Sequence, residues 1–468
     1  MNHIRHVPSG IDGFDAITDG GLPQGRATLV CGGPGSGKTL FGVQFVVNGA
    51  VKFGEPGVLI SFEETPDELI ADVAGLGWDL PRLVEDGLVA IDHVAALREE
   101  IEQTGAYDLS GLFVRLDYAI SKVGAKRIVL DTPEALFAAF DDTALLRSEM
   151  RRLFRWLKDK GITTVITAER GQDGITRHGF EEYVSDAVVV LDHRVYEQTA
   201  TRRLRVVKFR GSTHGTNEYP FMLDRRGFSV VPITAFDLGY ESSTERVSTG
   251  FEGLDEMLDG AGFFRATTAM VSGGSGTGKT TIAAQFAGAA SARGERVLYL
   301  SFEESAAQIM RNMRSVGLDL ASAVESGLLR FAATRPTQAG LEGHLTMLYG
   351  AVEEFEPTCV VLDPITDFQS LGSYFEIKAM LMRMVDFLKV RGITALFTSI
   401  TPENVDVDPT ISSLIDTWIQ VRNTERNGER KRGLYVLKSR GMPHSNRIRE
   451  FEFTPSGLKL TDDSGRAG

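Results

Sequence analysis

Cysteine is nearly absent from this sequence, whose 468 residues include only Cys31 and Cys359. Two cysteines cannot build a disulfide framework, so we expect a reducing compartment, the cytoplasm. Both stand in apolar, strand-like runs, where a thiol serves as a small buried hydrophobic group. Long apolar runs are absent too: none approaches the roughly 18 residues of a membrane helix, and residues 1–8 show no apolar signal segment. We therefore expect no association with membranes.

Positive charge is also scarce. The sequence has 50 Lys and Arg against 63 Asp and Glu, which gives a net charge of −13. A protein that coats nucleic acid needs a basic surface, so nucleic acid is not an expected partner, although a ring with an acidic exterior and a basic channel stays compatible with this balance. The length suggests two to four domains of about 100–200 residues each.

One glycine-rich motif is present twice, as Gly32-Gly33-Pro34-Gly35-Ser36-Gly37-Lys38-Thr39 and as Gly273-Gly274-Ser275-Gly276-Thr277-Gly278-Lys279-Thr280. Both copies fit G-x-x-x-x-G-K-[ST], in which backbone N–H groups surround phosphates, the lysine binds the β- and γ-phosphates and the threonine binds Mg²⁺. The alternative is a turn that merely ends a strand. Strand-like runs before the motifs and helical patterns after them favour the phosphate loop. The predicted nucleotide contacts are Gly33, Pro34, Gly35, Ser36, Gly37, Lys38 and Thr39, and Gly274, Ser275, Gly276, Thr277, Gly278, Lys279, Thr280 and Thr281.

The motif belongs to a longer repeat. Ser9-Gly10-Ile11-Asp12-Gly13-Phe14-Asp15 recurs as Thr249-Gly250-Phe251-Glu252-Gly253-Leu254-Asp255. Apolar strands alternate with helical patterns in each half, which is typical of a parallel sheet covered on both faces. We predict an α/β fold of two tandem P-loop NTPase domains with mostly parallel, doubly wound sheets. The predicted ranges are 1–234 for the first domain, 235–246 for a linker, 247–460 for the second domain and 461–468 for a disordered tail.

Carboxylates follow the predicted strands at two places in each half. Asp131 and Asp363 each end an apolar run, the position from which an NTPase carboxylate holds Mg²⁺; a helix cap is the alternative. The pairs Glu63-Glu64 and Glu303-Glu304 end another strand, where a carboxylate orients a water or accepts a hydroxyl proton. Neighbours on a strand point to opposite faces, so one glutamate of each pair is expected to face the phosphates. The alternative is a solvated acidic turn.

Two basic residues follow a strand in each half, Lys208 and Arg210 in the first and Lys438 and Arg440 in the second. Strand alternation places each pair on one face. One interpretation is an arginine finger that reaches the γ-phosphate of a neighbouring subunit and contributes about 10³–10⁵ in rate. The other is a basic edge strand whose charges discourage aggregation.

Together these residues resemble the KaiC family of circadian-clock ATPases, which have tandem RecA-like domains. The resemblance rests on the opening motif at residues 9–15, both phosphate loops, both Phe-Glu-Glu runs and the segment 208–220. It implies a hexameric double ring with ATP and Mg²⁺ between subunits. It further implies slow hydrolysis in the first tier, and self-phosphorylation and dephosphorylation in the second. The residues implied to contact a neighbour's nucleotide are Lys208, Phe209, Arg210, His214, Lys438, Ser439, Arg440 and His444.

The family's phosphorylation signature is a pair of hydroxyl residues, two further residues and an aspartate. Ser412 and Ser413, followed by Asp416, fit it, whereas Glu182 and Tyr183 replace the hydroxyl pair in the first half. The resemblance therefore implies phosphoacceptors only in the second half. From the residues alone, a helix N-cap or an exposed loop is the alternative for Ser412 and Ser413.

The sequence departs from the family at three points. Val407 stands where a further Thr is frequent, Pro443 stands where the best-known members carry Trp, and only residues 451–468 follow Glu450, where clock-type members carry a long tail that binds the activator KaiA. A KaiA-type activator is therefore not expected, while a KaiB-type partner is compatible. Two other functions stay open: a RecA-like DNA motor, for which the Arg-rich residues 422–432 are the nearest candidate, and a nucleotide-gated scaffold.

Overall fold

The computed structural model divides the chain into two compact units, residues 1–235 and 236–468, and each is considered by itself. The described residues are 5–94, 109–134, 143–171, 174–176, 185–196, 199–232, 242–401, 409–426, 429–455 and 457–461. All of the predicted tail except Thr461, and most of the predicted linker, lie outside them. Arg246, the last residue of that linker, pairs with Phe264 as part of the short strand β12 (Arg246–Val247).

The first unit is built on a nine-stranded sheet in the order β11-β10-β9-β8-β3-β7-β6-β4-β5. Six of its strands run parallel, and β9, β10 and β11 extend the sheet antiparallel beyond β8. The predicted doubly wound α/β fold is confirmed. The strands are β3 (Ala27–Gly32), β4 (Gly57–Ser61), β5 (Val89–His93), β6 (Arg127–Asp131), β7 (Thr163–Glu169), β8 (Ala187–Tyr196), β9 (Thr199–Phe209), β10 (Glu218–Asp224) and β11 (Gly227–Val230).

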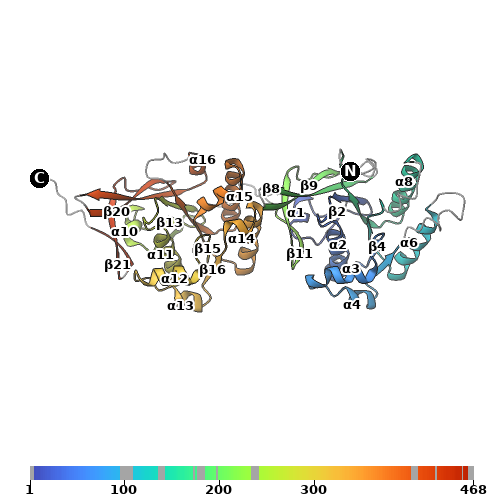
Figure 1. Ribbon diagram of the computed structural model, residues 1–468, viewed down its shortest axis with the longest axis horizontal. Coiled ribbons are helices and arrows are strands. Elements are labelled where there is room, and N and C mark those ends of the chain that lie inside the picture. The colour runs from blue at the N-terminus through green and yellow to red at the C-terminus, as the bar shows by residue number, and fades with distance from the viewer. Residues whose placement is uncertain are drawn as a thin grey trace. The chain divides into compact units, whose positions relative to one another are not determined.

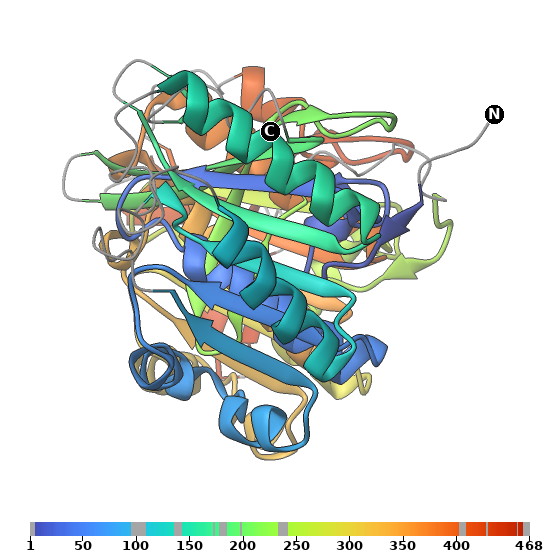
Figure 2. The same ribbon diagram turned by 90° about the vertical axis from the view of Figure 1, so that its right-hand side faces the viewer.

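Helices cover both faces of this sheet because its inner strands are apolar on both sides. On β3, Val30 packs with residues of α2 (Lys38–Phe53), α3 (Pro66–Val73) and α4 (Leu80–Glu85). Its neighbours Leu29 and Cys31 pack on the other side, with α6 (Ser110–Val123) and α8 (Thr143–Asp159). Figure 2 shows α6 and α8 in front of this sheet. A short hairpin of β1 (His6–Val7) and β2 (Leu22–Pro23) flanks α1 (Phe14–Ile17).

The second unit repeats this topology, with the sheet order β16-β15-β17-β18-β14-β19-β20-β21-β22. Its strands are β14 (Thr268–Gly273), β15 (Val297–Ser301), β16 (Leu329–Ala333), β17 (Cys359–Asp363), β18 (Thr394–Ile400), β19 (Thr417–Arg426), β20 (Glu429–Ser439), β21 (Arg449–Thr454) and β22 (Gly457–Leu460). Its other elements, labelled where space allows in Figure 1, are α10 (Glu252–Met257), β13 (Phe263–Phe264), α11 (Lys279–Ala292), α12 (Ala306–Arg314), α13 (Ala321–Glu325), α14 (Leu341–Phe355), α15 (Tyr374–Val390) and α16 (Pro409–Ser412).

Two features of this fold position the functional residues. The carboxyl ends of β14, β15 and β17 lie together because these parallel strands belong to one stretch of sheet, as do those of β3, β4 and β6. β9 lies between β8 and β10, and β20 between β19 and β21, but β10 pairs only with residues 203–205 and β21 only with residues 432–434, so neither outer strand reaches Lys208 or Lys438. The interpretation of these basic residues as protection for an exposed strand edge therefore stays a prediction. Within the described ranges, no helix combines the length and apolarity needed to cross a bilayer.

Candidate nucleotide sites

Each phosphate loop connects the central strand of its sheet to a largely buried helix, β3 to α2 and β14 to α11. Gly37 and Gly278, directly before these helices, have φ of 92° and 101°, a left-handed conformation that suits glycine. A Cβ on Gly278 would lie 2.9 Å from the Phe453 ring. The loops present the N-termini of α2 and α11, where free N–H groups and the helix dipole favour an anion.

The side chains of the two motif lysines bond to backbone carbonyls of their own phosphate loops. Lys38 Nζ donates to the carbonyls of Gly32 and Gly33 at 3.0 and 3.1 Å, and Lys279 Nζ donates to the Gly274 carbonyl at 2.7 Å. Burial lowers the pKa of Lys279, while the charges of Asp363 and Glu303 oppose this shift. An ammonium group in this position is placed to pair with a phosphate held by the loop N–H groups.

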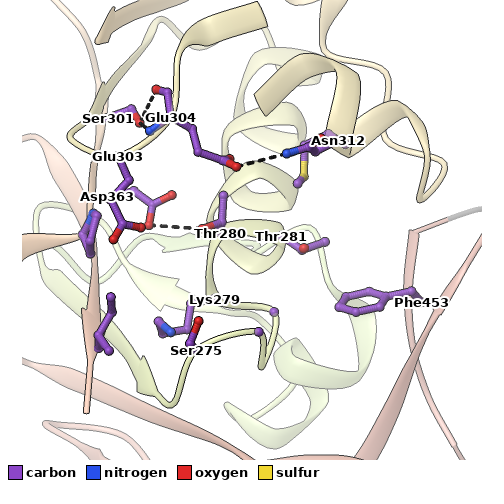
Figure 3. Close-up of a pocket in the computed structure, with 15 residues that line it drawn as sticks. Ser275, Lys279, Thr280, Thr281, Ser301, Glu303, Glu304, Asn312, Asp363 and Phe453 are labelled. Carbon is purple, nitrogen blue, oxygen red and sulfur yellow. Dashed lines mark hydrogen bonds between the residues drawn. The ribbon is translucent and has the colours of Figure 1, made fainter. Parts of the chain in front are cut away.

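A threonine from each loop meets the aspartate at the end of a neighbouring strand. Thr39 Oγ1 donates to Asp131 at 3.0 Å, and Thr280 Oγ1 lies 3.4 Å from Asp363 (Figure 3). Asp131 is also bonded by Thr167 Oγ1 at 2.6 Å, and burial raises its pKa. P-loop proteins bind Mg²⁺ through a hydroxyl oxygen and a nearby carboxylate, so these residues fit this ion.

The two glutamates after β15 point in different directions. Glu304 accepts a hydrogen bond from Asn312 Nδ2 of α12 at 3.1 Å, whereas Glu303 lies on the side of Asp363 and Lys279 (Figure 3). Burial and the negative charges of Asp367 and Asp363 raise the pKa of Glu303. Both glutamates lie in the bend after Ser301, the last residue of β15, so strand alternation does not explain their divergence. Glu303 is the glutamate beside the loop lysine.

In the first unit, both glutamates of the corresponding pair have raised pKa values. Burial and then the charge of Asp131 raise the pKa of Glu63, while burial and then the charge of Asp72 raise that of Glu64. Glu63 is also close enough to Lys38 to feel its positive charge. Glu63 therefore corresponds to Glu303 in its surroundings as well as in its place in the repeat.

In the second unit, the phosphate loop, both glutamates and Asp363 line one cavity of about 370 Å³. Its walls come from the phosphate loop, from Glu303, Glu304 and Asp363, and from Phe453 of β21, which faces Glu303 across the cavity (Figure 3). A pocket with a phosphate loop at one wall and an aromatic ring at another suits a nucleotide, whose triphosphate is anionic and whose base is flat and apolar.

Sequence reasoning did not assign four residues to this site. Phe453, Asn312 and Tyr299, whose hydroxyl donates to Asp363 at 2.7 Å, carry no motif that would have marked them. Arg432 belonged to the segment considered for DNA binding. Its guanidinium carbon lies 4.5 Å from the centre of the Phe453 ring, and its Nε lies 3.5 Å from the Gly276 carbonyl. Arg432 therefore lies beside the nucleotide pocket.

The Lys-x-Arg pairs lie toward the amino end of the central strand of each sheet, away from the phosphate loop at its carboxyl end. Lys438 pairs with Trp418 and thus stands level with Met270, while the Arg440 N–H bonds the Asp416 carbonyl, level with Thr268, the first residue of β14. The phosphate loop follows the opposite end of that strand. Lys208 pairs with Val188 in the same way, level with Leu29. A role for these cations in their own unit's phosphate loop is disfavoured by this register.

The predicted acceptors contact the basic pair of the same unit. Ser412 is the last residue of α16 and Ser413 is exposed in the turn that follows, so the N-cap interpretation is wrong for both. Lys438 Nζ bonds the Ser412 carbonyl and lies 3.4 Å from its hydroxyl, and Arg440 donates to the Ser413 carbonyl at 2.9 Å. Glu182, Tyr183 and Val407 lie outside the described residues.

The other implied trans contacts differ in exposure. Phe209 is 7% exposed and packs in the core, and His214 stacks on it with ring centres 6.2 Å apart. Ser439 Oγ shares a 3.0 Å hydrogen bond with Thr417 Oγ1. His444 is partly buried, with Nδ1 3.4 Å from the Ser445 carbonyl.

Comparison with known proteins gives matches over both units. A family model described as the KaiC ATPase matches twice, over residues 7–235 and 247–465. The circadian clock protein KaiC2 of a Synechocystis species is 52% identical over 97% of this chain and 81% of its own length. The circadian clock oscillator protein KaiC of Synechococcus elongatus is 38% identical over 98% of this chain and 89% of its own length. The matches thus extend over both phosphate loops and both Lys-x-Arg pairs.

Proposed function

Because this chain belongs to the KaiC family of ATPases, as its motifs indicated, we propose that it forms a homohexameric double ring with ATP and Mg²⁺ between subunits in both tiers. The first half hydrolyses ATP slowly, and the second transfers phosphate to Ser412 or Ser413 of a neighbouring copy of the chain. The relatives are named as circadian clock proteins, so the activity is assigned to timing or signalling, with a KaiB-like protein as a candidate partner.

The observation that carries this proposal is the separation of two half-sites within each unit. The phosphate loop follows the carboxyl end of β14, while Lys438 and Arg440 lie toward the amino end of that strand. Each unit therefore has its phosphate loop at the carboxyl end of the central strand and its two cations toward the amino end. A neighbouring copy that docks loop to cations completes the site, and closed rings are the usual result of such head-to-tail contacts.

Phosphate binding, Mg²⁺ binding and general-base catalysis can each be assigned to residues of the site. Lys38 and Lys279 bind the phosphates, while Thr39, Asp131, Thr280 and Asp363 hold Mg²⁺, which neutralises charge on the transferring phosphoryl group. Glu63 orients the attacking water in the first half. Glu303 accepts the proton of the serine hydroxyl in the second, a role that its raised pKa favours.

Phosphoryl transfer then proceeds between two copies. The Ser412 or Ser413 oxygen of one subunit forms a bond to the γ-phosphorus held by its neighbour, and the bond from that phosphorus to the β,γ-bridging oxygen breaks. ADP leaves with the electron pair, and the serine proton passes to Glu303. The Ser412 hydroxyl lies 3.4 Å from Lys438 Nζ, a cation that offsets the incoming phosphate charge, and Arg440 donates to the backbone carbonyl of Ser413 in the exposed turn.

Incubation with Mg²⁺ and γ-labelled ATP, followed by mass spectrometry of the phosphopeptides and light scattering, tests the proposal. We expect label on Ser412 or Ser413 and the mass of six chains. Label elsewhere or a monomeric mass would contradict it. Rings that bind ATP with neither hydrolysis nor label would instead support a nucleotide-gated scaffold, and ATP hydrolysis stimulated by DNA would support a DNA motor.

A further inference from the structure

We propose that Tyr299 is a positioning residue for magnesium binding in the second half: its hydroxyl fixes the Asp363 carboxylate, a constraint that the first half lacks. The inference rests on the proposed function, because it requires Mg²⁺ at Asp363. It concerns a difference between the two sites that their shared motifs do not encode.

The tyrosine is held rigidly beneath the site. Tyr299 stands in the middle of β15 with its side chain fully buried, and its ring packs against Phe331 with ring centres 5.1 Å apart. β15 pairs in parallel with β17, which ends at Asp363. The hydroxyl reaches the end of that neighbouring strand and donates to one Asp363 oxygen at 2.7 Å. A buried donor with a fixed ring holds its acceptor in one orientation.

The first half has no hydroxyl in this place. Leu59 occupies the corresponding position of β4, two residues before the serine of the repeated Ser-Phe-Glu-Glu run, as Tyr299 does in β15. Leu59 pairs with Val129 and Tyr299 with Val361, so the register to the strand that ends in aspartate is also the same. The replacement therefore adds one hydrogen-bond donor in an otherwise equivalent framework.

The added donor changes how the aspartate oxygens are shared. In the first half, Thr167 bonds one oxygen of Asp131 and Thr39 bonds the other. In the second half, Tyr299 holds one oxygen of Asp363, and Thr398 and Thr280 both meet the other. The loop threonine is also farther away, at 3.4 Å instead of 3.0 Å. One oxygen of Asp363 is thus directed at the loop threonine, and the second is tied to the core.

A hydrogen bond behind a metal-holding carboxylate sets the orientation of that carboxylate, and its loss typically costs about 10–100-fold in metal affinity. Tyr299→Phe removes the hydroxyl and keeps the ring in its core position. We therefore expect Mg²⁺ affinity to fall by about 10–100-fold in the second half. The first half, which lacks the tyrosine, should not change.

The test measures metal binding directly. The full chain carries Lys38→Ala, so that only the second site binds nucleotide, and Mn²⁺ is titrated by electron paramagnetic resonance with a non-hydrolysable ATP analogue. Tyr299→Phe is compared with Tyr435→Phe, which removes a hydroxyl of the same unit that bonds Gln420. Thermal melting in metal-free buffer checks that each variant is folded.

A dissociation constant for Mn²⁺ that rises about 10–100-fold in Tyr299→Phe and stays unchanged in Tyr435→Phe is the expected result. An unchanged dissociation constant in Tyr299→Phe would overturn the inference. The inference would also fail if Tyr299→Phe weakened Mn²⁺ binding by the same factor in a chain that already carries Asp363→Asn, because the tyrosine would then act without Asp363. If the Lys38→Ala chain itself binds no Mn²⁺ with the analogue, the proposed function fails instead.

Discussion

The ammonium group of Lys438 lies against Ser412 of the same chain, bonded to its carbonyl and 3.4 Å from its hydroxyl. A cation predicted to reach a neighbour's γ-phosphate and a serine predicted to receive it are therefore presented together. Burial and the charge of Arg440 lower the pKa of Lys438. A phosphate that approaches Lys438 from a neighbouring subunit also approaches Ser412.

Removal of this cation should slow phosphorylation. For Lys438→Met we expect the rate of label incorporation to fall by about 10³-fold, the lower end of the range for a trans cation. Lys459→Met, which removes an exposed lysine of β22, is the matched control. Initial rates with γ-labelled ATP measure the effect. Equal rates for the two variants would remove Lys438 from the site.

Substitution of the two glutamates of the second half should affect the phosphorylation rate to different extents. Glu303→Gln removes the proposed base and should lower the phosphorylation rate by about 10²–10⁴-fold. Glu304→Gln disturbs a hydrogen bond to Asn312 and should cost far less. Single-turnover phosphorylation of the two variants, with nucleotide affinity as the control, makes the comparison. A larger loss in Glu304→Gln would transfer the role to that residue.

The pH dependence of phosphorylation follows from the raised pKa of Glu303. The base must be ionised, so the rate should fall as the pH drops through a pKa that lies above the usual value of 4.5. Asp367 is one of the charges that raise this pKa, so Asp367→Asn should move the acid limb to lower pH. Rates of label incorporation across a pH series test this, and a limb that stays in place would show that another group titrates.

A separate prediction concerns stability. Glu295 is bonded by Arg265 at 3.1 Å and Arg293 at 2.8 Å, and these hydrogen bonds hold its pKa at about 2 against the effect of burial. A depressed carboxyl pKa stabilises the fold above the unfolded-state pKa of about 4.3, and the contribution is lost as the pH falls toward about 2. After allowance for solvent screening, Glu295→Gln should lower the free energy of unfolding by about 1–2 kcal/mol at pH 7.

Urea unfolding of the two chains from pH 7 to pH 3 measures this difference. It should shrink as the pH falls below about 5, because the wild-type carboxylate then loses its advantage over glutamine. A difference that is independent of pH would show that Glu295 acts through packing instead of charge.

The parts of the site that the sequence predicted are those whose chemistry is local. Lys38 and Thr39 occupy fixed places in one motif, and Asp131 follows an apolar strand, so spacing alone located them. Strand alternation also predicted that neighbouring glutamates diverge, although both lie in the bend after β15. It did not say which one faces the phosphates, because that depends on Asn312 of a helix that packs from outside the motif.

Other features depend on pairings between distant segments. Phe453 reaches the phosphate loop from β21, although it follows Gly278 by 175 residues (453−278) in the sequence. Tyr299 looks like any other apolar strand residue until β15 is paired with β17. The pairing of β20 with β21, which covers residues 432–434 and stops short of Lys438, likewise appears only in the folded unit.

Phosphorylation in mixed rings is the most direct test of a site shared between two copies. Lys279→Ala chains keep their serines but lose the second phosphate loop, and Ser412→Ala, Ser413→Ala chains keep the loop but lose the acceptors. The two are tagged, mixed without nucleotide and then supplied with Mg²⁺ and labelled ATP. We predict that neither is labelled alone and that label appears on the Lys279→Ala chain after mixing. Absence of label from that chain in rings shown to contain both variants would contradict the account.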